Sequence, residues 1–376
     1  ALVDILPSGH SARVRTIQRH GQKVRHAAAG DRAAINLVGV ELDQVERGDV
    51  LATAGLFERT SMIDVSLELL ASSPAPLAQR TRVRLHVGTA EVLARVILLD
   101  CDQLAPGDRG LAQLRLEKPL CVAWGDRFVL RRYSPALSIG GGTVLDPHPH
   151  KHRRADGATC KQLCSLESTD VRVVLEALLR RDEDRLCAQR QLAATCALSI
   201  SEVGAILAEL HGSGRVLLSG PSGDQTTLHA DVASLWSDRI ASSLADFHAE
   251  YPLRDGLRRE ELRQRSARYA QSELFDWVLG QMEAAGHVEI RGSVVCLTGH
   301  SIEFSEEENV LRQRVEERVR TRDWAALQDA AGLARSLGIS PSALDPVLGA
   351  LQRLGVVINL EGGMLLHVDI VAEARE

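Results

Sequence analysis

The residues with the clearest capacity for chemistry are basic side chains in the front part of the sequence. Residues 1–154 carry 21 lysines and arginines against 16 acidic residues, whereas the remaining 222 residues carry 23 against 34. From Arg80 to Val87 basic side chains alternate with apolar ones, which predicts a strand with one buried and one positively charged face. Arginine presents a fork of donors that fits a phosphate group. Any contact with nucleic acid is therefore expected in this front part, and an ordinary solvated face is the alternative.

Histidines and cysteines also cluster, between residues 148 and 164. His148, His150 and His152 alternate along the chain, and Cys160 and Cys164 follow. Structural zinc sites draw their ligands from separated pairs, which this run of histidines does not match. The two cysteines have the spacing of one face of a short helix. We therefore predict no metal site. The neighbouring cations are interpreted as a basic hinge that faces RNA: Lys151, Arg153 and Arg154.

Signatures of catalysis are missing from the sequence. It contains no Gly-x-x-x-x-Gly-Lys-Ser/Thr phosphate loop, no Gly-x-Ser-x-Gly, no His-Glu-x-x-His and no Cys-x-x-Cys. The run Gly140–Gly142 could cradle a phosphate if a helix followed it, but a short strand and Pro147 follow. Three successive glycines instead predict a strand that lies close to another backbone. We expect no enzyme activity from this chain alone and no bound cofactor.

These side chains must be positioned by elements of two kinds, and the first kind is the β-strand. Short strands separated by Gly, Pro, Asn and Asp turns fill the front part and predict two β-barrels. The first barrel, at 1–59, is too short to close, so we expect its first strands upstream. The second, at 62–148, is long enough to be complete. Residues 149–168 are predicted to be a basic linker.

The second kind is the helix, which dominates beyond residue 168 and forms an internal repeat. Gly214, Gly286 and Gly355 lie 72 and 69 residues apart, and each follows an amphipathic helix and precedes a strand. Three helices and a two-stranded ribbon in each repeat predict three winged helices. The fold class is therefore multidomain, with β-barrels followed by tandem α+β winged helices. The three modules are expected at 169–230, 232–299 and 306–369.

The third helix of a winged helix usually enters the DNA major groove. The three predicted here begin with serine caps at Ser201, Ser272 and Ser340. Apart from Arg353 they carry no lysine or arginine, so the main non-specific contribution to DNA affinity is missing. We interpret the modules as spacers or protein-contact modules. The rival function is a winged-helix DNA-binding transcription regulator with a β-barrel sensor domain.

Several strings resemble a known family. In the first barrel these are Leu6–Gly9 and Ala29–Leu37, in the second they are Thr81–Val92 and Ile139–Pro147, and in the second winged helix it is Tyr251–Arg254. With the order of the domains, these strings make the chain similar, over essentially its whole length, to the bacterial selenocysteine-specific elongation factors (SelB). That family is related to EF-Tu, so the resemblance implies EF-Tu-like β-barrels.

The resemblance implies a function and a larger protein. Members of this family deliver selenocysteyl-tRNA to the ribosome at UGA codons specified by an mRNA hairpin (SECIS). They are cytoplasmic GTPases, and we expect the GTPase domain, with its P-loop, GTP and Mg²⁺, upstream of residue 1. A fourth winged helix, the main hairpin reader, is expected downstream. The barrels would hold the charged tRNA, the winged helices would form an arm toward the mRNA, and the protein would be a monomer that contacts no membrane.

The resemblance also assigns roles to individual residues. By motif, Arg32 corresponds to the arginine thought to recognise the selenocysteinyl group. A guanidinium favours a selenolate anion over a neutral serine hydroxyl. An ordinary charge at a strand entry is the alternative. The implied tRNA-binding surface comprises Arg13, Arg15, Arg19, Lys23, Arg25, Arg80, Arg82 and Arg84.

Overall fold

The computed structural model describes residues 1–153, 156–221, 223–321, 329–360 and 363–373. The chain forms two compact units, Ala1–Asp231 and Val232–Glu376. The first unit holds two β-rich domains and one winged helix. The second holds two more winged helices. Arg154, which belongs to the predicted hinge, lies outside the described residues.

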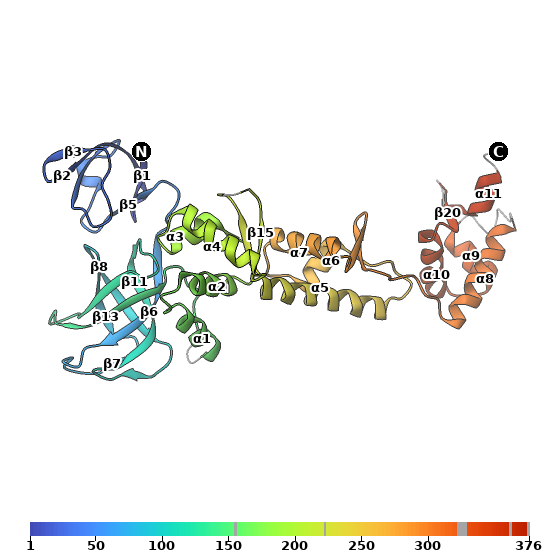
Figure 1. The fold of residues 1–376 in the computed structure, drawn as a ribbon. Coiled ribbons are helices and arrows are strands. Elements are labelled where there is room, and N and C mark those ends of the chain that lie inside the picture. Colours follow the sequence, from blue (N-terminus) through green and yellow to red (C-terminus); the bar gives the residue numbers. More distant parts are fainter. Residues whose placement is uncertain (154–155, 222, 322–328, 361–362, 374–376) are drawn as a thin grey trace. The chain divides into compact units, whose positions relative to one another are not determined.

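The first domain is a five-stranded antiparallel sheet (Figure 1). Its path runs β3-β2-β1-β5, and β4 pairs with β2. Only a few of its side chains are buried, among them Ile5 and Ala12, so its core is small. Its strands are β1 (Leu2–Leu6), β2 (His10–Arg19), β3 (Gln22–Val24), β4 (Ala33–Val38) and β5 (Val50–Thr53), with a 3₁₀ turn at Leu42–Gln44.

The second domain is a closed barrel in which β11, β6, β13, β12, β8 and β9 follow one another around the wall. Apolar side chains alternate along the strands, so that Ile63, Val65 and Leu67 point inward and are fully buried. The wall strands are β6 (Thr60–Leu69), β8 (Arg82–Val87), β9 (Ala90–Leu98), β11 (Arg109–Leu120), β12 (Arg127–Arg132) and β13 (Ser138–Asp146). The short β7 (Leu77–Ala78) and β10 (Gln103–Leu104) pair with each other.

The run Gly140–Gly142 lies in β13, between β6 and β12. A Cβ on Gly142 would stand 1.9 Å from the backbone oxygen of Ser66, and one on Gly141 would stand 2.5 Å from that of Phe128. The neighbouring backbones leave no room for a side chain. The predicted close approach of this strand to another backbone is confirmed, and no helix follows it.

The first winged helix packs directly on the barrel. Leu99, Leu111 and Leu145 of the barrel share one hydrophobic cluster with the module's helices. The predicted linker 149–168 is therefore wrong in its second half, because α1 (Gly157–Ser165) forms there and its Leu163 is buried in that cluster. The elements of the module are α2 (Val171–Arg181), β14 (Cys187–Ala188), α3 (Gln189–Thr195), α4 (Ile200–Gly212), β15 (Val216–Ser219) and β16 (Thr226–His229).

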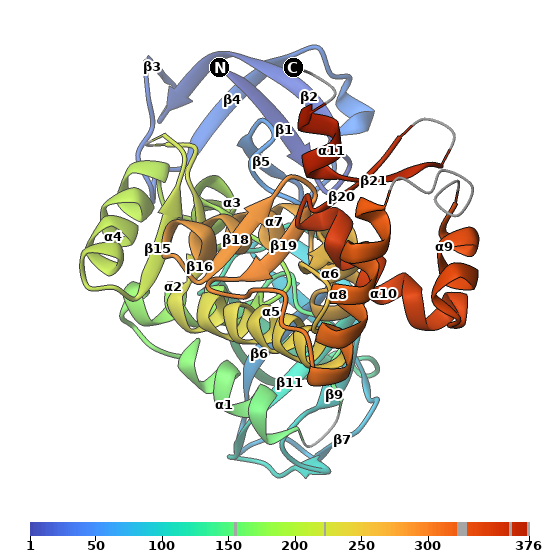
Figure 2. The same ribbon diagram turned by 90° about the vertical axis from the view of Figure 1, so that its right-hand side faces the viewer.

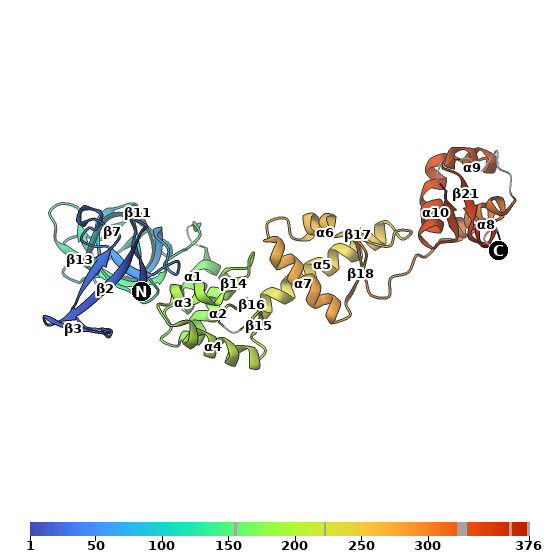
Figure 3. The ribbon, with the colours of Figure 1, turned by 90° about the horizontal axis from the view of Figure 1, so that it is seen from above.

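The second and third winged helices make up the other unit. In the second module the ribbon of β18 and β19 is extended by β17, which pairs with β19 (Figure 2). Its elements are α5 (Ala230–Glu250), β17 (Leu257–Arg258), α6 (Arg259–Ser266), α7 (Ser272–Ala284), β18 (Val288–Arg291) and β19 (Val294–Leu297). The third module comprises α8 (Glu306–Arg320), α9 (Ala330–Leu337), α10 (Pro341–Arg353), β20 (Val357–Asn359), β21 (Leu365–His367) and α11 (Val368–Glu373) (Figure 3).

The repeated glycines end the third helices as predicted. Gly214, Gly286 and Gly355 all have positive φ, of 72°, 73° and 70°. In each case the next residue donates its N–H to a carbonyl five positions earlier, at 2.9 Å. The serine caps were predicted less well. Ser340 caps α10, but Ser199 rather than Ser201 caps α4, and Gln271 precedes α7 without a side-chain cap. The fold class, β-barrels followed by winged helices, is confirmed.

Candidate nucleic-acid interface

A row of arginines crosses the outer wall of the closed barrel. Arg82 on β8 lies opposite Arg95 on β9, and Arg95 lies opposite Arg115 on β11. Directly opposed residues of neighbouring antiparallel strands project from the same face, where like charges repel. Arg80, which precedes β8, lines one surface hollow together with Arg95 and Arg115. We call these four residues, Arg80, Arg82, Arg95 and Arg115, the arginine ladder.

The ladder has few counterions. Arg82 makes a two-pronged ion pair with Glu117, at 2.8 Å from Nε and 2.5 Å from Nη2. This pair lowers the pKa of the Glu117 carboxyl. Among the described residues, no carboxylate pairs with the other three arginines, and the Nε of Arg115 is buried without a hydrogen-bond partner. Glu117 also attracts Arg95, so the charge of the hollow is only partly compensated. Its excess positive charge suits an anion with several oxygens, such as a phosphodiester.

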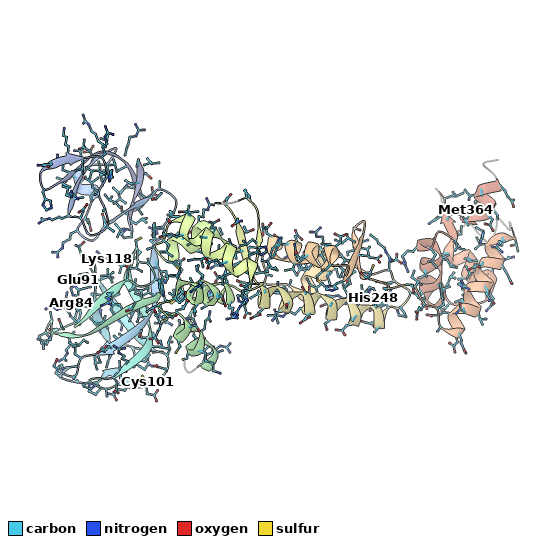
Figure 4. The ribbon with its side chains drawn as sticks, in the orientation of Figure 1. Arg84, Glu91, Cys101, Lys118, His248 and Met364 are labelled. Atoms are coloured by element: carbon cyan, nitrogen blue, oxygen red, sulfur yellow. The ribbon has the colours of Figure 1, made fainter. Side chains whose placement is uncertain are left out.

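Arg82 and Arg84 are held in place by an aromatic ring. Their guanidinium carbons lie 4.6 Å and 5.5 Å from the centre of the Tyr133 ring, close enough for cation–π attraction. Arg84 also donates to the backbone oxygen of Tyr133 at 3.2 Å and pairs with Glu91, which lies beside it in Figure 4. The hydrogen bond from Arg84 lowers the pKa of Glu91. The ion pair with Glu91 largely neutralises Arg84, whereas Arg80 and Arg115 in the hollow have no such partner among the described residues.

The remaining predicted surface residues lie in the first domain, and all six side chains are exposed. Arg19 forms an ion pair with Asp31 at 3.2 Å, and the same carboxylate accepts the N–H of Ala28 at 2.9 Å. Arg32 follows immediately and enters β4. In the described part of the chain no ion pair or hydrogen bond joins these residues to the ladder. The six are Arg13, Arg15, Arg19, Lys23, Arg25 and Arg32.

The segment after the barrel is anchored by a buried polar cluster rather than free. Asp64 of β6 is fully buried, and its carboxylate pairs with the ring of His152 and accepts from Gln113 at 2.9 Å. The same Gln113 amide donates to the backbone oxygen of His150 at 2.9 Å. Burial raises the pKa of Asp64, and the hydrogen bond to Asp64 raises that of His152. Lys151 and Arg153 are exposed between and beside these anchors, so their contact with RNA stays a prediction.

A second buried cluster fixes the first winged helix to the barrel. Asp146, at the end of β13, is 1% exposed and pairs with Nη1 of Arg181 on α2. Arg181 also makes a two-pronged pair with Asp182, at 2.9 Å for both contacts, and Arg185 adds a third contact at 2.9 Å. Although burial opposes ionisation, the arginines hold the pKa of Asp182 below its ordinary value. The charges are thus paired within the joint between the two domains.

Sequence reasoning missed Arg95 and Arg115. Each stands apart from the basic string at Arg80–Arg84, on a strand that carries other charged residues as well, and only the pairing register brings them beside Arg82. Their strand alternation was a usable signal that each points outward. In the described residues no three His, Cys, Asp or Glu side chains converge as metal ligands would.

Comparisons with known proteins agree with this architecture. Residues 2–52 match the model of elongation factor Tu domain 2, and residues 64–151 match that of the β-barrel domain of the selenocysteine-specific elongation factor. Residues 241–297 match the winged helix of elongation factor SelB. The chain is a SelB-like protein.

Relatives of this SelB-like chain carry the same description. It is 30% identical over 324 residues to the selenocysteine-specific elongation factor of Desulfomicrobium baculatum, covering 84% of this chain and 49% of that protein. The corresponding factor of Escherichia coli K12 is 27% identical over 366 residues, covering 96% and 55%. The SelB-like chain therefore spans about half the length of these relatives.

A solved structure shares the fold. The crystal structure of bacterial selenocysteine-specific elongation factor EF-Sec aligns with a TM-score of 0.55 at 18% identity, covering 97% of the SelB-like chain and 64% of that one. Within the described residues no single helix has the length and apolar composition to cross a membrane. The helices α3 and α4 reach this length and apolar composition only when they are taken together, and they are bent by 113° relative to each other.

Proposed function

We propose that this chain forms the tRNA-holding and arm-forming part of a selenocysteine-specific elongation factor. The whole factor would deliver selenocysteyl-tRNA to the ribosome at UGA codons specified by an mRNA hairpin. GTP and Mg²⁺ would be bound by a GTPase domain in a longer protein, since this sequence holds no phosphate loop. The proposal rests on the SelB relationship and on the chemistry of the barrel.

The single observation that carries the tRNA role is the hollow of the arginine ladder. Three arginines without carboxylate partners in the described residues stand together on a rigid wall, where their mutual repulsion is relieved when an anion binds. A tRNA backbone carries one phosphate per nucleotide, so several can meet the ladder at once. Each phosphate that an arginine neutralises releases counterions. The exposed cations of the first domain would extend this surface toward the aminoacyl end.

The tRNA role is tested by affinity for labelled tRNA. The variant Arg95→Ala/Arg115→Ala removes two phosphate contacts, and we expect about ten-fold or more weaker binding at moderate salt. Arg190→Ala is the matched control, because this exposed arginine of the first winged helix makes no ion pair in the described residues. Equal affinities of the ladder variant and the control would refute the tRNA role of the ladder.

Selenocysteine specificity is proposed to depend on Arg32. Its exposed guanidinium would stabilise a selenolate but gain little from a seryl hydroxyl. In the full-length factor, Arg32→Ala should lower the preference for selenocysteyl-tRNA over seryl-tRNA, measured as a ratio of the two affinities. A loss of the same size for both tRNAs would show that Arg32 acts as an ordinary phosphate contact or strand-entry charge.

The winged helices are proposed to form an arm and not to read DNA. In the first module α4 carries Glu202 and Glu209 and no lysine or arginine, and its Glu202 is engaged by the cap residue Ser199. A transcription regulator would bind random duplex DNA tightly and with a steep salt dependence. A gel-shift titration at two salt concentrations tests this rival.

Deleting residues 232–299 from the full-length factor should leave tRNA binding intact and uncouple it from the hairpin.

A further inference from the structure

The turn between the second and third helices can be compared across the modules of the repeat. In the first module it spans 196–199, between α3 and α4, and in the second it spans 267–271, between α6 and α7. In the third it spans 338–340. Because the modules share one fold, a difference between these turns reports a difference in what they contact.

The turn of the first module lies beside the barrel, with Cys196 buried and Ala197 and Ser199 exposed. The N–H of Trp124 on the barrel donates to the oxygen of Thr195 at 2.7 Å, and the Trp124 indole donates to Leu166 at 2.8 Å. Cys196 is 4% exposed, and Ala197 lines a hollow with barrel residues. This surface of the first winged helix is therefore used for docking on the barrel.

The turn of the second module presents an aromatic ring and a cation instead. Tyr269 is 85% exposed, far more than any other aromatic side chain among the exposed large apolar residues of the described chain. The guanidinium carbon of Arg268 lies 5.7 Å from its ring centre. In the described part of the chain Arg268 has no ion pair. The three arginines of α6 are paired instead: Arg259 with Asp276, Arg263 with Glu260 and Arg265 with Glu261.

We propose that Arg268 and Tyr269 form a contact site for an unpaired RNA nucleotide. An exposed ring offers a face on which any base can stack, and an unneutralised arginine beside it offers a donor fork to the adjacent phosphate. A protein partner would need only apolar cover, whereas the free positive charge favours a polyanion. The acidic α7 does not take part, so this site is separate from the helix that reads DNA in other winged helices. The inference adds an RNA contact to an arm that the proposed function treats as a spacer.

The experiment uses the whole chain and two RNA probes. One is a fluorescent twelve-nucleotide oligouridine and the other is a fully paired RNA hairpin of similar length. Tyr269→Ala should weaken binding of the oligouridine by about five-fold or more. About five-fold corresponds to the smallest free energy expected for the loss of one stacked base. Tyr269→Phe keeps the ring and should retain most of the affinity, and Arg268→Ala should reduce both the affinity and its salt dependence.

The ladder variant Arg95→Ala/Arg115→Ala separates this site from the tRNA surface. It should weaken binding of the paired hairpin. Adding Tyr269→Ala to the ladder variant should lower the affinity for oligouridine by the same factor as in the wild type. If Tyr269→Ala binds oligouridine as tightly as the wild type while the ladder variant loses hairpin affinity, the RNA contact is refuted and the proposed function stands. The turn would then be a protein-docking surface, like its counterpart in the first module.

Discussion

The first and second winged helices have the same fold but differ in the side chains at the turn before the third helix. In the first module Thr195, the last residue of α3, accepts a hydrogen bond from the barrel residue Trp124, and the helices share a core with Leu99, Leu111 and Leu145. The turn before α7 in the second module exposes Tyr269 and Arg268. The comparison teaches that the shared winged-helix fold does not by itself decide what a module contacts. What each copy does depends on which side chains occupy the same few positions.

The largest effect should come from breaking the buried charge cluster of the first module. Arg181→Ala leaves Asp146 and Asp182 buried without their partner, and we expect the free energy of unfolding of the first unit to fall by about 3–5 kcal/mol. Arg180→Ala is a matched control one residue away. It removes an exposed pair with Asp231 and a longer contact with Glu176, and should cost about 1 kcal/mol or less. Chemical denaturation measures both, and equal small losses would mean that the cluster does not fix the module to the barrel.

The shared hydrophobic core provides the next test. Leu145 is 1% exposed between the barrel and the helices, so Leu145→Ala should destabilise the unit by about 2–5 kcal/mol. Leu137, 51% exposed and only eight positions earlier, should tolerate the same change within about 0.5 kcal/mol. A two-step unfolding curve in the wild type, with the winged helix melting alone, would contradict a single shared core.

The joint should also respond to pH. The hydrogen bond to Asp64 raises the pKa of His152 above its usual 6.5, so protonated His152 stabilises the folded state. This contribution is complete below pH 6.5 and is lost as the pH rises through the raised pKa. The melting temperature of the wild type should therefore fall more between pH 6 and 9 than that of His152→Gln. Parallel curves for the two proteins would show that the pair adds no pH-dependent stability.

The smallest stability effect should be found in the second module. Tyr269→Ala and Arg268→Ala remove exposed side chains and should change the free energy of unfolding by no more than about 0.5 kcal/mol, while RNA binding changes. Circular dichroism during denaturation checks this. A large destabilisation would mean that the turn is structural, which would remove the contrast with the first module.

Local patterns in the sequence predicted the local parts of the fold. The glycine at the end of each third helix needs only its own positive φ, so Gly214, Gly286 and Gly355 were found from the repeat alone. The cap at Ser199 was missed because Ser201 lies two residues further on and offers the same chemistry. The spacing of Cys160 and Cys164 fits the α1 helix, but its packing against the barrel was missed because a run of polar residues precedes Leu163.

The candidate site, too, was predicted only where its residues are close together in the sequence. Arg80, Arg82 and Arg84 stand together in one string and were predicted from it. Arg95 and Arg115 join them only through antiparallel pairing across β8, β9 and β11, which depends on contacts between distant segments. The glutamates that neutralise Arg82 and Arg84 come from other strands as well, so the sequence overestimated the free charge of those two residues.

The most direct test of the tRNA-holding role is the salt dependence of tRNA binding by this chain. Affinity measured from low to moderate salt gives a slope that counts neutralised phosphates, and each lost contact lowers it by about one. We predict that Arg95→Ala/Arg115→Ala reduces the slope by about two relative to Arg190→Ala. An unchanged slope would contradict the assignment of the arginine ladder to tRNA.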